Sequence, residues 1–127
     1  MGKEKICIEY VFNKASKNSL WNHLTTPTGL ADWFADDVSV NGNEFTFTWN
    51  KSEQKAMQIA SSNLSYIRFK WEEDEDEESY FEFRLHVIEI TGAIALEVID
   101  FVDAGEKEDT INLWDSQIKV LKRSLGV

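Results

Sequence analysis

Apolar and polar residues alternate at the start of the chain. Residues 5–12 place Ile6, Ile8, Tyr10 and Phe12 on one face. A period of two is typical of a β-strand with one buried side. We therefore expect the protein to open with a strand.

Two short helices are expected next. Ser16 is a suitable N-cap for a helix over residues 17–24, in which apolar side chains recur at helical spacing. Thr26 can cap a second helix, and Pro27 suits its first position. This second helix would hold three apolar side chains on one side: Leu30, Trp33 and Phe34.

From residue 38 onward the pattern predicts strands alone. Asn41-Gly42 is a strong signal for a two-residue hairpin turn. Further alternating segments follow at residues 44–49, 55–61, 64–71, 81–87 and 94–98. The apolar phase slips at Ile88 and Ile90, which suggests a β-bulge.

Residues 106–125 predict one long terminal helix. Its apolar positions recur at spacings of three and four, the pattern of an amphipathic helix: Ile111, Trp114, Ile118, Leu121 and Leu125, with Leu113 and Val120 widening the stripe. Acids lie in its first turn and bases near its last, as the helix dipole favours. The order of strand, two helices, six strands and helix predicts an α+β fold in which the long helix covers one face of a sheet.

Length and charge narrow the possible functions. A chain of 127 residues suits one domain with one core. The net charge is −10, and most of it lies in a run of seven acids at residues 72–78. An acidic protein is repelled by nucleic acid and by anionic membranes, so neither is an expected partner.

Candidate chemistry is sparse. Cys7 is the one cysteine, so no internal disulfide forms, and it is expected half-buried on the outward face of its strand. His23 and His86 lack partners at metal-ligand spacing, and no glycine-rich phosphate loop is present. We expect no metal and no cofactor. The absence of a signal peptide and of a membrane-spanning segment favours a cytoplasmic protein without membrane insertion.

The segment from Trp21 to Phe34 is similar to a known signature. Its Trp-x-x-Leu-Thr-x-Pro stretch runs into Leu-x-x-Trp-Phe, which resembles the heat-shock-protein-90 ATPase activator homologues of the START-like (SRPBCC) superfamily. Three further segments are similar to family motifs: Gly42–Phe47, Ile67–Trp71 and the helix from Trp114 to Lys122. The acidic run is a departure, because relatives usually have a shorter hairpin there.

The resemblance implies a helix-grip fold, in which a curved seven-stranded antiparallel sheet wraps around the C-terminal helix. It implies a single START-like domain over residues 1–127. Members of the superfamily bind lipids, sterols, polyketides or other hydrophobic molecules, and some catalyse cyclisation or dehydration of such ligands.

The aromatic residues are the most informative candidates. They share one face of successive strands, opposite apolar positions of the terminal helix, and could either fill a core or line a pocket. As ligand-binding residues we name Phe45, Phe47, Trp49, Phe69, Trp71, Phe81, Phe83, Ile111, Trp114 and Ile118. The leading hypothesis is a non-enzymatic domain that binds a hydrophobic or amphipathic small molecule.

Two alternatives remain open. The acidic run at residues 72–78 is either a solvated hairpin tip or a contact for a basic protein partner, which would make the domain a chaperone-linked interaction module. A cyclase- or dehydratase-type enzyme would instead need polar groups such as His86, Arg84 or Tyr66 inside the cavity. The sequence leaves the oligomeric state open.

Overall fold

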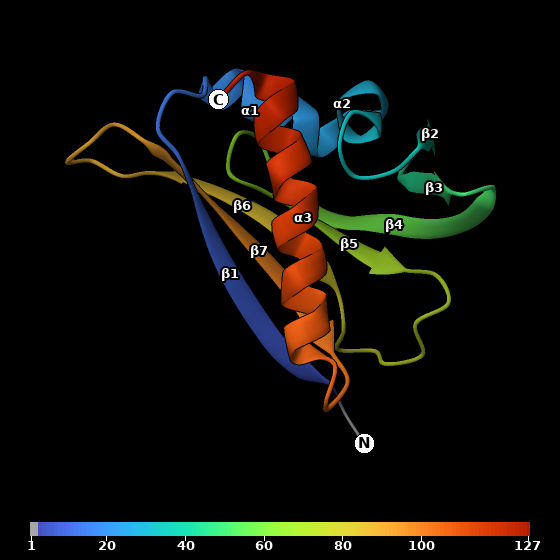
Figure 1. Ribbon diagram of the computed structural model, residues 1–127. Helices are drawn as coiled ribbons and strands as arrows, with labels where there is room; N and C mark the ends of the chain where they lie inside the picture. The colour runs from blue at the N-terminus through green and yellow to red at the C-terminus, as the bar shows by residue number, and fades with distance from the viewer. Residues whose placement is uncertain (1–2) are drawn as a thin grey trace.

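The computed structural model describes residues 3–127 and contains seven strands and three helices (Figure 1). In chain order they are β1 (Glu4–Phe12), α1 (Lys17–Thr25), α2 (Pro27–Ala31), β2 (Asp37–Asn41), β3 (Glu44–Trp49), β4 (Ser52–Ser62), β5 (Tyr66–Trp71), β6 (Phe81–Val87), β7 (Ile94–Val102) and α3 (Lys107–Leu125). This is the element order that the apolar pattern predicts.

All seven strands form one antiparallel sheet in the order β1-β7-β6-β5-β4-β3-β2. Strands β2 to β7 are sequential neighbours, while β1 joins the edge beside β7. The sheet is curved, α3 runs along its concave face, and α1 and α2 lie at one end (Figure 1). The expected helix-grip fold is confirmed.

The two short helices begin and pack as the sequence predicts. The Ser16 side chain accepts a hydrogen bond from the Ser19 backbone N–H, and Thr26 caps α2 through the Gly29 N–H. Gly29 is required at its position, because a Cβ there would lie 2.3 Å from the backbone oxygen of Asn22. The absence of a side chain at Gly29 therefore lets α2 pack against α1.

The prediction of a β-bulge at Ile88 and Ile90 is wrong. The chain leaves the sheet after Val87 and turns, and Ile90 at the turn is 97% exposed. The register shift occurs instead in β4, between Gln58 and Ala60. The apolar phase slip at residues 88–90 therefore marks the end of a strand, where an apolar residue stands in a solvent-exposed turn.

Helix α3 buries a narrower stripe than the sequence predicts. Trp114, Ile118 and Leu121 are buried against the sheet. Leu113 and Val120, which were expected to widen the stripe, are 60% and 38% exposed. One helix resting in a curved sheet touches it along a single line of side chains, so positions beside that line face solvent.

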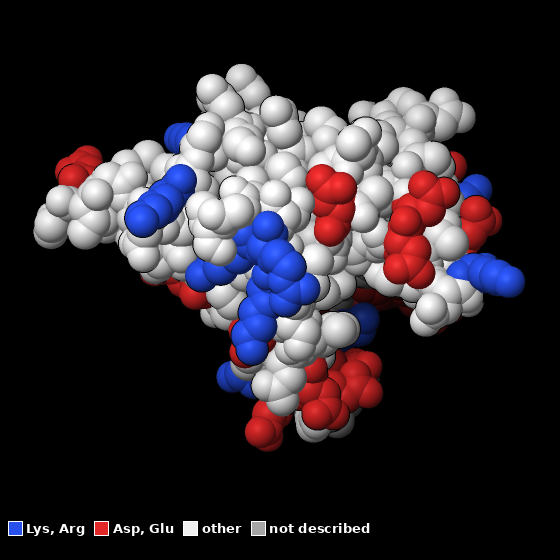
Figure 2. Space-filling model, turned by 45° about the horizontal axis from the view of Figure 1, so that its top comes forward, with Lys and Arg blue, Asp and Glu red and all other residues white. Residues whose placement is uncertain are grey.

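Charged side chains are unevenly distributed over the surface. On the face in Figure 2, a group of basic side chains lies near the centre, and acidic side chains gather mainly on the right and at the bottom of the view. Among residues 3–127, no helix is both long enough and apolar enough to cross a membrane.

Candidate functional site

A pocket of about 410 Å³ opens between the first half of α3 and the ends of five strands. Its wall is formed by Phe34, Trp49, Gln54, Trp71, Phe81, Asp100, Thr110, Leu113, Trp114 and Gln117. Half of these residues are aromatic, so the wall is mostly apolar.

The five aromatic rings of the wall form a connected series. Trp71 lies between Trp49 and Phe81, at centroid distances of 6.1 and 4.8 Å. Phe34 stacks on Phe81 and on Trp114, both at 5.8 Å. Such ring pairs add stability beyond the area they bury, so the rings hold one another in place beside the open volume.

Hydrogen bonds fix the residue at the centre of this series. The backbone oxygen of Phe34 accepts from Trp49 Nε1 at 2.7 Å and from Gln117 Nε2 at 3.2 Å. These bonds tie the segment after α2 to β3 and to α3. Both donors point at protein rather than at the pocket, which leaves the Trp49 ring to present its carbon surface.

Asp100 is the one ionisable side chain in the described wall of the pocket. Its carboxylate accepts hydrogen bonds from Trp114 Nε1 at 3.0 Å and from the Phe101 N–H at 2.8 Å. Burial nevertheless raises the pKa of this carboxyl, with these bonds acting in the opposite direction. The Asp100 carboxyl is therefore a polar group in a pocket wall that is otherwise largely aromatic.

The predicted ligand-binding residues divide into two groups. Trp49, Trp71, Phe81 and Trp114 line the pocket. Five others lie in the packed core, each no more than 3% exposed: Phe45, Phe47, Phe69, Phe83 and Ile118. Ile111 is half-buried on α3 and belongs to neither group.

Sequence reasoning missed several residues of the wall, and one of them left a signal. Asp100 follows Val98 at the inward-facing position of β7, where an acid interrupts an apolar series. The alternating pattern predicts a strand that ends at residue 98, whereas β7 continues to Val102 and includes this acid. Leu113 was assigned to the helix stripe, and nothing in the local pattern marks Gln54, Thr110 or Gln117.

The polar residues of the enzyme hypothesis lie on the other side of the sheet. Arg84 and His86 alternate with buried residues of β6, and the Arg84 guanidinium lies over the ring of Tyr66 at 4.5 Å. Arg84 also pairs with Glu82 at 2.9 Å, and Arg68 pairs with the same carboxylate at 2.7 Å. These side chains form a polar layer on the convex face, away from the pocket.

A group of possible metal ligands also lies on the convex face. Ligand atoms of Glu9, His86 and Glu97 come within 4.8 Å of one another. In the structure they pair among themselves, with His86 Nδ1 3.1 Å from Glu97.

Cys7, near this group, is exposed and not half-buried as the sequence predicts. Partial desolvation of its sulfur and a hydrogen bond to Glu97 nevertheless raise the pKa of the thiol, which disfavours the reactive thiolate.

A second hollow, of about 380 Å³, lies at the opposite end of α3. Residues from the end of β1 and the loop after it, including Lys14, form one part of its wall, and residues near the C-terminus, including Lys122, form the other. The Lys122 ammonium lies 5.1 Å from the ring centre of Phe12. This hollow lacks the aromatic wall of the first pocket.

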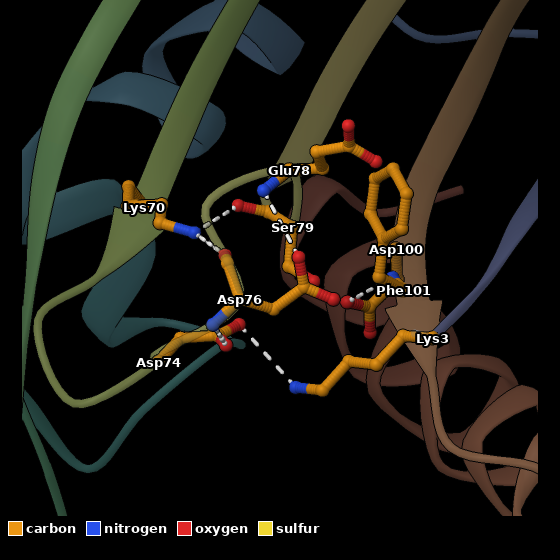
Figure 3. Close-up of polar contacts among 8 residues, drawn as sticks. All are labelled: Lys3, Lys70, Asp74, Asp76, Glu78, Ser79, Asp100 and Phe101. Carbon is orange, nitrogen blue, oxygen red and sulfur yellow. Dashed lines mark hydrogen bonds and ion pairs between the residues drawn. The ribbon is translucent and has the colours of Figure 1, made fainter. Parts of the chain in front are cut away.

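The acidic run is folded back on the protein (Figure 3). The Lys70 ammonium donates to the backbone oxygens of Asp76 and Ser79, the latter at 2.7 Å. Lys3 pairs with Asp74 at 3.3 Å, and the Asp74 side chain is only 10% exposed. The solvated hairpin tip predicted for residues 72–78 therefore does not extend to Asp74 and Asp76, which are half-buried because two lysines anchor the loop.

The remaining acids of the run do face solvent. Glu72, Glu73, Glu75, Glu77 and Glu78 are exposed, while Asp74 and Asp76 are half-buried. Inward and outward side chains thus separate the like charges. The loop joins Trp71 to the strand that begins at Phe81, and both of these residues line the pocket.

Solved structures with this fold include proteins of several origins. A Bacteroides fragilis protein, solved in solution by NMR, is 46% identical over 98% of this chain and 92% of its own, with a TM-score of 0.70. The Aha1 dimer of Colwellia psychrerythraea is 18% identical, covers 96% of both chains and has a TM-score of 0.78.

DynU16, a protein of the dynemicin biosynthetic locus, has a TM-score of 0.79 at 16% identity. The match covers 97% of this chain but 47% of DynU16, so the chain spans about half of that protein.

No curated protein matches the chain. The model of the START-like superfamily domain matches residues 1–127. The chain therefore belongs to the START-like superfamily, as its motifs indicate.

Proposed function

We propose that this domain binds a hydrophobic or amphipathic small molecule, lipid-like or polyketide-like, in the pocket beside α3 and does not transform it. The observation that carries this proposal is an open volume of about 410 Å³ with five aromatic side chains and Leu113 in its wall. Small-molecule sites are typically concave, mostly apolar and fitted with a few polar groups. This pocket has each of those properties.

The contrast with the rest of the concave face supports the proposal. Where rings only serve the core, they bury one another completely, as Phe47 and Phe69 do at 0% exposure. Trp49 and Trp71 remain half-buried on either side of the pocket. When a ligand covers large apolar side chains that are partly exposed in a pocket, the burial of their surface contributes favourably to the free energy of binding.

Membership of the START-like superfamily and the likeness to DynU16 agree with this proposal. DynU16 comes from a biosynthetic locus, which makes a natural-product-like ligand a reasonable class to test. The polar groups named for the enzyme hypothesis lie on the convex face. The acidic loop anchors on the protein's own lysines. The position of these polar groups and the anchoring of the loop therefore give no support to either alternative.

The direct test is native mass spectrometry of freshly purified protein, followed by solvent extraction and identification of any bound molecule. We expect an adduct of a few hundred daltons that is lost on denaturation. The probe for added ligand is an environment-sensitive naphthalene dye, whose fluorescence rises in an apolar pocket.

A pair of variants separates the pocket from non-specific binding. Leu113→Trp fills the pocket from an exposed position of α3, so it should block binding with little effect on folding. Val120→Trp adds the same side chain to an exposed position of the same helix that does not line the pocket. Equal dye binding by both variants would contradict the proposal, as would the absence of any binding to the unaltered protein.

A further inference from the structure

The pocket combines an aromatic wall with one half-buried acid. Among the residues that line it, the groups other than aromatic rings and Leu113 are three neutral polar side chains and Asp100. Aromatic rings present a negative face, which attracts cations within about 6 Å of the ring centre. A carboxylate inside such a wall adds a full negative charge at short range.

Asp100 has hydrogen-bond donors around it but no ionic partner. Trp114 and Phe101 supply N–H donors to its two carboxylate oxygens. Within residues 3–127, no Lys, Arg or His side chain lies within ion-pairing distance of this carboxylate. Lys3 acts electrostatically on Asp100, and more strongly than Asp74 does, but its ammonium forms its ion pair with Asp74. A half-buried carboxylate without an ion-pair partner leaves a place for a positively charged group.

The acidic loop adds charge of the same sign at the pocket's edge. It leaves the wall at Trp71 and returns to it at Phe81, and Asp74 within it acts electrostatically on Asp100. Five glutamates of the loop are exposed. Clefts lined by charge of one sign raise the local concentration of opposite charges and speed their association.

The features nearby that carry the opposite sign are offset. Helix α3 begins beside the pocket with the positive end of its dipole, but Glu108 and Asp109 occupy its first turn. The ammonium groups of Lys3 and Lys70 are held by the loop itself. Lys107, the first residue of α3, likewise pairs with Glu4, so each positive feature near the pocket has an acidic neighbour.

We propose that the pocket selects a hydrophobic organic cation, a molecule whose apolar body packs on the aromatic wall and whose amine or quaternary ammonium group pairs with Asp100. The exposed glutamates of the acidic loop attract this cation to the pocket. This inference rests on the proposed function and specifies the charge of the ligand. It also relates the acidic run, the least expected feature of the sequence, to the site.

The test uses three probes of similar size that differ in charge: naphthylmethylamine, naphthalenemethanol and naphthoic acid. Isothermal titration calorimetry at neutral pH and low salt measures each dissociation constant on the full chain. We expect the amine to bind about tenfold or more tightly than the alcohol, and the acid to bind weakest. This ranking in the unaltered protein requires no variant to fold.

Two variants locate the effect. Asp100→Asn keeps the shape of the side chain and removes its charge, so it should abolish the preference for the amine over the alcohol. Replacing the five exposed glutamates of the loop by Gln, with Asp74 and Asp76 kept to hold the loop, should slow association of the amine several-fold and flatten its salt dependence.

The outcomes distinguish this inference from the function on which it rests. If amine and alcohol bind equally, and Leu113→Trp blocks both, the pocket binds small molecules but the cation preference is wrong. Tighter binding of naphthoic acid would also overturn that preference, since it would mean that Asp100 does not repel anions. If none of the probes binds, both the proposed function and this inference fail.

Discussion

The two ends of the concave face are built from the same kind of residue and differ in how they are filled. Around Phe47, Phe69 and Phe83 the rings are fully buried in the hydrophobic core. Around Trp49 and Trp71 the rings are half-buried and border a pocket of about 410 Å³. An alternating aromatic strand thus specifies an apolar face, and the elements packed on it decide whether that face becomes core or site.

The covering elements explain the difference. Leu20, Leu24 and Leu30 from α1 and α2 join the packed cluster and are 0% exposed. These two helices lie at one end of the sheet (Figure 1). At the pocket end only α3 crosses the face, and its wall residue Leu113 is largely exposed. A single helix fills less of a curved sheet than three helices do.

The largest expected effect is the contrast between one ring from each end. Phe47→Ala removes a fully buried side chain and should lower the free energy of unfolding by about 3–5 kcal/mol. Trp71→Ala removes a half-buried ring beside an open volume and should cost roughly 1–2 kcal/mol. Urea unfolding followed by far-UV circular dichroism measures both. Equal losses would mean that the two ends are packed alike.

The loop at the pocket end provides the next contrast. Lys70→Met leaves the backbone oxygens of Asp76 and Ser79 without their ammonium donor, at a cost of about 1 kcal/mol. The anchored acidic loop should then open more often and be cut several-fold faster by a glutamate-specific protease. Lys55→Met, which removes a more exposed lysine paired with Glu44 on β3, is the matched control. Equal cleavage of both variants would show that Lys70 does not hold the loop.

The sequence was sufficient for the elements of this fold because its local signals agree with the tertiary structure. Ser16, Thr26 and Pro27 stand at helix starts, and Asn41-Gly42 stands at a hairpin turn. The prediction was wrong where the spacing of apolar residues was the one signal for a structural feature. Ile88 and Ile90 look like a strand out of phase, yet the chain turns there, and Ile90 packs on nothing.

The site was predictable only in part. The aromatic face could be recognised by alternation, but the division into core and pocket residues depends on which elements cover them. Phe34 reaches the pocket because its backbone oxygen is bound by Trp49 and Gln117, which are 15 and 83 residues away in sequence. Local pattern carries no information on contacts at such separations. Asp100 is the exception, since an acid at an inward position of a strand is visible in the sequence.

The smallest expected effect concerns the pH dependence of stability at the pocket end. Burial raises the pKa of Asp100 above 3.8, so folding favours the protonated carboxyl. Its contribution to stability is therefore complete below pH 3.8 and is lost as the pH rises through the pKa of the folded state. Relative to Asp100→Asn, the unaltered protein should lose stability over that interval and then level off.

The measurement is the difference in free energy of unfolding between the unaltered protein and Asp100→Asn across acidic and neutral pH. Asp103→Asn, which changes an exposed acid three residues further along, provides the reference difference. A difference curve that rises with pH would mean that the folded protein stabilises the charged carboxylate without a ligand. The naphthylmethylamine cation should reverse the fall at neutral pH, because it supplies the counter-ion that the folded chain does not. The acid that lowers the stability of the protein alone at neutral pH would then stabilise its complex with the cation.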